Sequence, residues 1–331
     1  MAVFEMSADL SFLETSLKQL NAITEESYSE QIAPIALKLW QKHLQLENPQ
    51  WKFIIAKPFS IKGKHGSAHV MAMVDKRLPD IGLVGYFACT DSAAGAKVLE
   101  EASDWLNKEH GLKDVYGPIN GTLPSDYRLN LDNDFRFPGE PVNPLWYVDA
   151  FEKAGFGVFN RYVSGISKHY QLLMKLVIRK PRKEYRHLTV RSFNASKLKE
   201  DFKIYHQLRN AIFPFQSVYC PAISLQERVY NSSGKFDPKY TYFLVDKGRE
   251  VGFVMAYAYD QQLVLKTIGL LPEYQGKRLS GLLLKPIHDQ ASSEGLNKAI
   301  YGMVRVGNAA YRMKKPGVKV FRKYVTMRKQ L

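Results

Sequence analysis

One short segment of the chain, Ile268 to Gly281, combines residue types that bind an anion through the backbone. It lies between a strand-like run and a helix-like run, so the first N–H groups of the helix would be free for a ligand. Gly276 and Ser280 are small enough for phosphate oxygens to approach the backbone. Lys277 and Arg278 would add charge-assisted hydrogen bonds. The segment therefore predicts a cradle for a pyrophosphate, which the helix dipole would also favour.

The elements that must position this cradle follow from changes in hydrophobic period. They are, in chain order, a hairpin of Tyr242–Asp246 and Glu250–Tyr259, a strand over Gln262–Leu271, a helix over Lys277–Glu294, a strand over Lys298–Val304, a short helix over Asn308–Lys314 and a strand over Val318–Arg328. The predicted cradle is thus the connection from a strand to a helix.

These residues and this order of elements resemble the acetyl-CoA-binding half of GNAT-type N-acyltransferases. Members of that family carry Q/R-x-x-G-x-G/A after a strand that usually ends in x-V-x-P-x-Y. This chain has Leu270-Leu-Pro-Glu-Tyr-Gln275, continued by Gly-Lys-Arg-Leu-Ser280. Gln275 matches the first motif position, while Arg278 replaces the middle glycine and Ser280 the final small residue.

The resemblance implies acetyl-CoA as co-substrate. Its pyrophosphate would bind the loop and the start of the helix, at Gln275, Gly276, Lys277, Arg278, Leu279, Ser280 and Gly281. The strand that carries Leu270 would splay from its neighbour, and the backbone N–H near Leu270 would polarise the thioester carbonyl. Asn308 would cap a short helix and bond the pantetheine arm.

The residues that would act as acid and base are less clearly indicated by the sequence than the residues of the cofactor loop. The family often has an acid tyrosine seven residues after the asparagine, where this chain has Lys315. Tyr311, one helical turn earlier, is the nearest substitute, with core packing as its alternative role. Asp260 and Glu227 are candidate bases, and both also fit ordinary surface carboxylates.

The first half of the chain has a fainter form of the same pattern. Asn143-Pro-Leu-Trp-Tyr147, followed by Ala154-Gly-Phe156, resembles the family's segment from asparagine to Gly-Phe. The loop before its long helix contains Asp91, which would repel a pyrophosphate. The resemblance therefore implies an α+β fold of two tandem GNAT-like domains, each a mixed, mostly antiparallel sheet flanked by helices. Residues 1–180 would form a degenerate domain and residues 181–331 the acyl-CoA-binding domain.

Composition limits the class of protein. The 331 residues are 45% hydrophobic and 24% charged, which is typical of globular domains. Two cysteines indicate neither a disulfide framework nor a zinc site, and we expect no metal. No signal peptide or membrane span is evident, so we expect a cytoplasmic protein. The formal charge of +15 admits an anionic partner such as tRNA or another nucleic acid, or simply a soluble basic surface.

Three functions remain open from the sequence. The first is transfer of an acetyl or other acyl group from acetyl-CoA to an amine of a small molecule or peptide. The second is a Fem-type transferase that uses aminoacyl-tRNA, which the positive charge favours and the preserved loop disfavours. The third is a non-catalytic GNAT-fold protein that binds a ligand or RNA, which Arg278 and Lys315 would favour.

Overall fold

The computed structural model describes residues 11–64, 66–121, 127–132, 137–178, 181–213, 223–232, 237–308, 311 and 317–331. The chain forms two compact units that interleave along the sequence. Unit 1 contains Met1–Asn130, Pro141–Phe159 and Val325–Leu331, and unit 2 contains Leu131–Glu140 and Asn160–Tyr324. The sequence predicts domains as continuous segments, 1–180 and 181–331, and that division stays a prediction.

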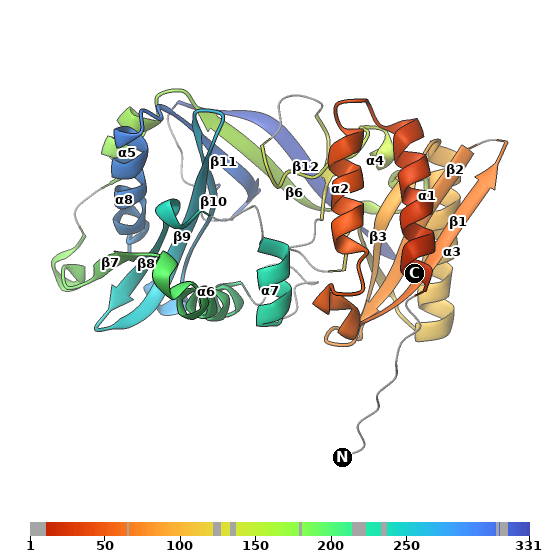
Figure 1. Ribbon diagram of the computed structural model, residues 1–331, viewed down its shortest axis with the longest axis horizontal. Helices are drawn as coiled ribbons and strands as arrows, with labels where there is room; N and C mark the ends of the chain where they lie inside the picture. The colour runs from red at the N-terminus through yellow and green to blue at the C-terminus, as the bar shows by residue number, and fades with distance from the viewer. Residues whose placement is uncertain are drawn as a thin grey trace, which may run out of the picture. The chain divides into compact units, whose positions relative to one another are not determined.

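Unit 1 is a sheet covered by helices on both faces. Its elements are α1 (Phe12–Ser27), α2 (Ala33–His43), β1 (Ile54–Gly63), β2 (Gly66–Asp75), β3 (Ile81–Cys89), α3 (Ser92–His110), β4 (Asp114–Gly117), β5 (Leu129–Asn130) and α4 (Tyr147–Lys153). Strands β1, β2 and β3 are antiparallel neighbours, and β4 joins β3 in parallel. Helices α1 and α2 lie on one face of this sheet and α3 on the other (Figure 1).

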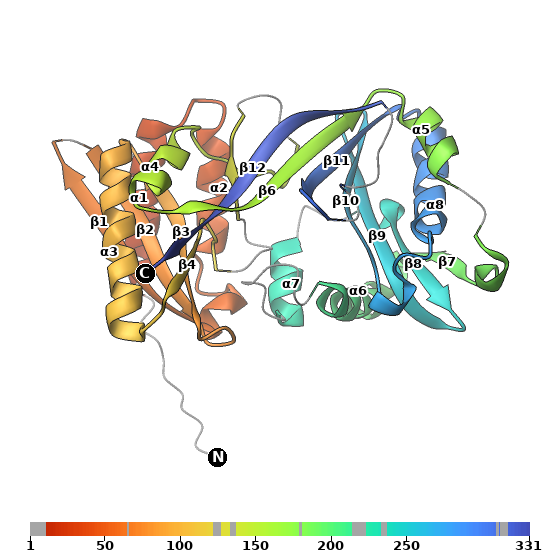
Figure 2. The ribbon, with the colours of Figure 1, turned by 180° about the vertical axis from the view of Figure 1, so that it is seen from behind.

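Unit 2 has the same kind of mixed sheet. Its elements are most of β6 (Gly157–Ser167), then α5 (Tyr170–Val177), β7 (Thr189–Ser192), α6 (Leu198–Ile212), α7 (Leu225–Ser232), β8 (Thr241–Asp246), β9 (Arg249–Tyr259), β10 (Gln262–Leu270), α8 (Ser280–Ser293), β11 (Lys298–Arg305) and the first part of β12 (Val318–Gln330). Strands β7 to β10 are antiparallel neighbours, and β11 joins β10 in parallel. Helices α5 and α8 lie side by side in this unit (Figure 2). The predicted α+β fold, a mostly antiparallel mixed sheet flanked by helices, is confirmed.

Two strands cross the division of the chain. Strand β6 follows α4 of unit 1, yet its residues Tyr162–Ser167 pair with β11 in unit 2. Strand β12 begins in unit 2, yet its residues Met327–Gln330 pair with β4 in unit 1. Each sheet therefore takes a strand that directly follows elements of the other unit in the sequence.

The core of unit 2 explains why its helices form where they do. One stripe of α6, made of Phe202, Tyr205, Leu208 and Ile212, is buried against the sheet. Helix α8 buries Leu283, Ile287 and Ala291 in the same core. Both stripes recur every three or four residues, as one face of a helix requires. Among the described residues, no helix is apolar over a length that would cross a bilayer.

Candidate acyl-CoA site in unit 2

The parallel strands β10 and β11 separate part-way along their length. They pair only from Gln262 opposite Lys298 to Leu265 opposite Tyr301. Beyond a bulge after Leu265, β10 continues to Leu270 beside β9 alone. The splay that the resemblance implied is therefore present, and it opens toward the end of β10 that leads into the predicted cradle.

A buried polar network holds β11 where it leaves β10. Met303 lies in the left-handed region, with φ +50°, and donates its N–H to Ser164 Oγ at 2.9 Å. Ser164 also shares a 2.8 Å hydrogen bond with the Tyr324 hydroxyl, which donates to the Glu140 carboxylate. Arg322 Nε lies 3.5 Å from Glu140, and both side chains are almost fully buried. Burial and the neighbouring carboxylate raise the pKa of Tyr324, so the phenol stays protonated and remains a donor.

The loop after β10 is tied down at both ends. Gln275 Nε2 donates to the carbonyl of Leu270 at 2.9 Å, which closes the loop onto the end of the strand. The Tyr274 hydroxyl donates to Asp246 Oδ2 at 2.6 Å, and this bond raises the pKa of Tyr274 to about 12. Gln275 thus acts on the shape of the loop through its side chain.

The centre of the loop has the backbone shape of an anion cradle. Gly276 and Arg278 both have positive φ, +74° and +61°. Helix α8 begins at Ser280 with no side-chain cap from Leu279, and Leu282 donates its N–H to the Leu279 carbonyl at 3.0 Å. The N–H groups of Ser280 and Gly281 are therefore the ones that a ligand would use. An added Cβ on Gly276 would meet nothing within 4 Å, which shows that the cradle is open there.

The two basic residues of the loop differ in their surroundings. Lys277 is half-buried, with Nζ 5.3 Å from the ring centre of Tyr185 and 5.7 Å from that of Tyr274. Arg278 is exposed and forms no ion pair with any residue in the described part of the chain. A positive charge is therefore fixed beside the cradle and a second one is free to reach an anion.

Comparison with known proteins agrees with this geometry. Residues 204–313 match the sequence model described as the acetyltransferase (GNAT) family. This part of the chain is therefore similar to the GNAT family. The match covers α6 from Ile204 onward, α7 and the strands and helix that form the candidate site.

Solved structures share the fold over a longer stretch. A tandem GNAT protein from the clavulanic acid biosynthesis pathway is 9% identical, with a TM-score of 0.51 over 98% of this chain and 96% of that one. A probable N-acyltransferase of unknown function from Enterococcus faecalis V583 is 10% identical, with a TM-score of 0.55 over 97% of this chain and 70% of that one. At these identities the similarity shows the fold alone. No curated protein matches the sequence.

The residues predicted to contact the pantetheine arm and to act as the acid follow β11. Asn308 Oδ1 accepts the N–H of Tyr311 at 2.7 Å, which is the bond that a capping asparagine makes, while most of the helix predicted there lies outside the described residues. The Tyr311 side chain is 46% exposed, which does not fit a packing role. Lys315 lies outside the described residues. The contacts of Asn308 and Tyr311 with a substrate stay predictions.

Asp260 lies away from the other predicted site residues. It and Gln261 have φ values of +46° and +55° in the tight turn between β9 and β10. Leu270 and the loop are at the opposite end of β10, a strand of nine residues, which corresponds to roughly 30 Å at about 3.3 Å per residue. The structure brings Leu270 and the residues from Gln275 to Gly281 together, but not Asp260.

The helix of unit 1 that corresponds to α8 is already capped by an anionic side chain. Asp91 Oδ1 accepts the N–H groups of Ala93 and Ala94 at 2.8 and 3.1 Å, at the start of α3. These bonds lower the pKa of Asp91, so the carboxylate is charged at neutral pH. A phosphate would have to displace it.

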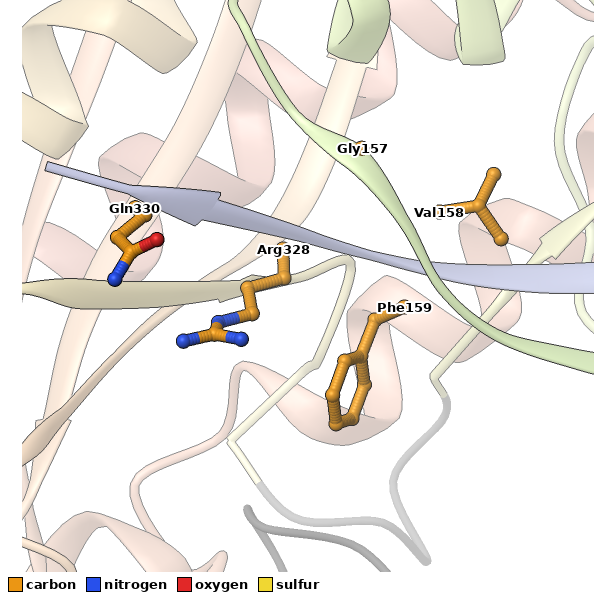
Figure 3. Close-up of a pocket in the computed structure, with 5 residues that line it drawn as sticks. All are labelled: Gly157, Val158, Phe159, Arg328 and Gln330. Atoms are coloured by element: carbon orange, nitrogen blue, oxygen red, sulfur yellow. The ribbon is translucent and has the colours of Figure 1, made fainter.

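A surface hollow in unit 1 has a different character. It has a volume of about 260 Å³ and is lined by Gly157, Val158, Phe159, Arg328 and Gln330 (Figure 3). Arg328 donates twice to Asp114 Oδ1, at 2.9 and 2.6 Å, so its charge is matched within the unit. None of the predicted cofactor residues lines this hollow.

Sequence reasoning missed two groups of polar residues near the opening of β10 and β11. One is the network of Ser164, Tyr324, Glu140 and Arg322, whose members are far apart in sequence. The other is a polar stripe on α6. A signal for the second was available, since His206, Arg209, Asn210 and Phe213 recur at helical spacing on a face other than the apolar one.

Proposed function

We propose that this protein transfers an acyl group from acetyl-CoA directly to an amine. The observation that carries the proposal is the separation of β10 from β11 beyond Leu265, with an anion cradle at the end of the freed strand. Acetyl-CoA would supply the activated acyl group as its thioester. The residues present fit its pyrophosphate, because open glycine backbone, helix N–H groups and two cations converge on one loop.

The roles of the individual residues follow from their places. The backbone from Gln275 to Gly281 would hold the pyrophosphate, with charge from Lys277 and Arg278. The N–H of Leu270 would face the thioester carbonyl, and Asn308 the pantetheine arm. Tyr311 would donate a proton to the leaving thiolate. The base is not assigned to Asp260, since that residue lies at the far end of β10.

We infer that unit 1 has a structural role and does not bind acetyl-CoA. The Asp91 carboxylate already accepts the N–H groups at the start of α3 that a phosphate would need. We also propose that the protein is cytoplasmic and uses no metal.

A matched pair of substitutions tests the cofactor site. Ser280 and Ser92 each occupy the first position of a helix, α8 and α3. S280D places a carboxylate where the pyrophosphate should bind, while it favours the helix dipole and so should preserve folding. We expect S280D to weaken acetyl-CoA binding at least tenfold in isothermal titration calorimetry, and S92D to leave it unchanged. No thermal shift of the wild type at millimolar acetyl-CoA would contradict the proposal.

The tRNA-dependent alternative rests on the net charge of +15 alone. It predicts tRNA binding that weakens steeply with added salt and aminoacyl transfer without acetyl-CoA. Filter binding at two salt concentrations, with acetyl-CoA titration of the same sample, separates the two functions.

A further inference from the structure

Helix α6 carries two stripes of different chemistry. The apolar stripe that ends at Ile212 is buried in the core of unit 2. The second stripe, which we call the acceptor stripe, consists of His206, Arg209 and Asn210 of the helix and of Phe213 at its C-cap, all half-buried. Phe213 packs on the core of unit 2, with its ring centre 6.3 Å from that of Phe253. The contacts of the three polar residues therefore indicate what the stripe does.

The acceptor stripe ends beside the freed part of β10. A Cβ added to Gly269 would lie 2.8 Å from Ile212 Cγ2 and 3.1 Å from Phe213 Cζ. The glycine therefore lets the end of α6 approach the strand closely. Gly269 is the neighbour of Leu270, whose N–H we propose faces the thioester. An acceptor amine that reaches this strand from the side of α6 would pass Phe213.

The stripe also holds positive charge at this end. The guanidinium of Arg209 lies 4.7 Å from the ring centre of Phe213. Within the described residues it forms no ion pair with any carboxylate, although it is half-buried. Desolvating a guanidinium without a partner costs free energy. Its placement on an aromatic platform keeps the planar donor group oriented for an anion.

A second arginine, from α7, reinforces this field. Arg228 donates from Nε to His206 Nδ1 at 3.1 Å and from Nη2 to Asn210 Oδ1 at 2.5 Å. Glu227 is the acidic residue beside this group. Its Oε2 accepts the N–H of Ser224 at 2.7 Å. Burial and Arg228 lower the pKa of His206, so the imidazole is neutral.

We propose that the acceptor amine carries an anionic group, a carboxylate or a phosphate, and that Arg209 binds it. This inference rests on the proposed acyl transfer and names the class of its acceptor. Arg209 is a specificity-determining residue here, since no residue in the described part of the chain forms an ion pair with it, whereas Arg228 donates to His206 and Asn210. Bidentate pairing of guanidinium with an oxyanion would orient the amine toward β10.

The test compares matched acceptors that differ only in the anion. The pairs are L-phenylalanine with phenethylamine for a carboxylate, and phosphoethanolamine with ethanolamine for a phosphate. We expect kcat/KM for the anionic member of at least one pair to exceed that of its neutral member at least tenfold, since a hydrogen bond to a charged group contributes about that factor. The pair that shows the preference identifies the anion.

Two variants assign the preference to Arg209. R209M keeps a long side chain on Phe213 and removes the charge, while K203M removes one charge from an exposed position of the same helix. We expect R209M to abolish the preference, through KM, with unchanged affinity for acetyl-CoA, and K203M to retain it. Calorimetric titration of the four acceptors into protein saturated with CoA gives the same comparison without turnover. Equal binding of charged and neutral acceptors, or a preference that survives in R209M, would overturn the inference. Failure of acetyl-CoA to bind would instead overturn the proposed function.

Discussion

Arg278 occupies a backbone position that glycine fills in the family motif. Its φ of +61° lies in the left-handed region, where a residue with a Cβ is disfavoured by about 1–2 kcal/mol. The loop thus retains the shape that the motif specifies, at a cost in conformational strain. In return, an exposed guanidinium stands beside the start of α8. This arrangement suggests that the positive charge of Arg278 favours anion binding and offsets the loss of the freely accessible positive φ that glycine would provide.

Substitution of Arg278 should separate these two effects. We expect R278G to raise the free energy of unfolding by about 1 kcal/mol, because the strain is relieved, and to weaken acetyl-CoA binding. R278N tolerates positive φ but has no charge, so it should bind the cofactor as weakly as R278G. Urea unfolding and calorimetry measure the two quantities. Unchanged affinity in both variants would exclude a contact between Arg278 and the phosphates.

The bond between Tyr274 and Asp246 should make stability depend on pH. The bond to Tyr274, followed by that to His187, lowers the pKa of Asp246 in the folded protein. The stabilisation is therefore present above the ordinary pKa of an aspartate and is lost as the pH falls through the folded value. We expect Y274F to lose less stability than wild type between pH 5 and pH 3 in thermal unfolding. Parallel curves for the two proteins would show that the bond contributes nothing.

At the scale of elements, the separation of β10 and β11 depends on what holds β11 on its other side. Ser164 on β6 binds Met303 at the point where the ladder between β11 and β6 is irregular, between Tyr301 and Val304. The serine hydroxyl replaces the strand partner that a left-handed residue cannot reach. The network behind it is buried, so loss of one member removes a buried hydrogen-bond partner from its neighbours.

Two serines of the same strand test this role. S164A should lower the free energy of unfolding by about 1–3 kcal/mol, because the Met303 N–H and the Tyr324 hydroxyl lose a buried partner. S167A should be near neutral, since the buried Ser167 hydroxyl makes no hydrogen bond within the described residues. Denaturant unfolding of both variants provides the comparison. An equal decrease in the free energy of unfolding for S164A and S167A would show that the hydrogen bond to Met303 contributes nothing to stability.

How far the sequence predicts this protein also depends on scale. The cradle is one continuous segment, so Gln275, Gly276 and their neighbours were predictable from local pattern and family motif. The acceptor stripe could be detected from the helical spacing of His206 and Phe213. Its proposed function could not, because that depends on Gly269, which only the fold brings beside it. The Ser164 network could not be predicted, because its members come from segments far apart in the chain.

At the scale of the whole molecule, the two units share strands along the chain. Residues 327–330 of β12 pair with β4, although the rest of the chain from 160 to 324 belongs to unit 2. Local periodicity predicts that a strand exists there but not which strand it pairs with. The sequence therefore does not predict that the two units interleave.

Removal of this last segment should damage unit 1 selectively. Deletion of Val325–Leu331 exposes one edge of β4 and removes buried Val325 and Met327. An unpaired strand edge is an aggregation site, so we expect a strong rise in light scattering on mild heating. Deletion of Leu331 alone, which is 37% exposed, should have little effect. A stable, monomeric product of the longer deletion would contradict this expectation.

The exchange of strands also bears on the order in which the protein is made. Strand β12 leaves the ribosome after the other strands of the described residues, yet β4 pairs with it and lies more than 200 residues earlier in the chain. Unit 1 must therefore wait for nearly all of unit 2 to be synthesised before its sheet is complete. During that interval β4 has an open edge, and its capture by the last strand of a different copy would join two nascent chains. The two halves of this protein are thus coupled in biogenesis as well as in sequence.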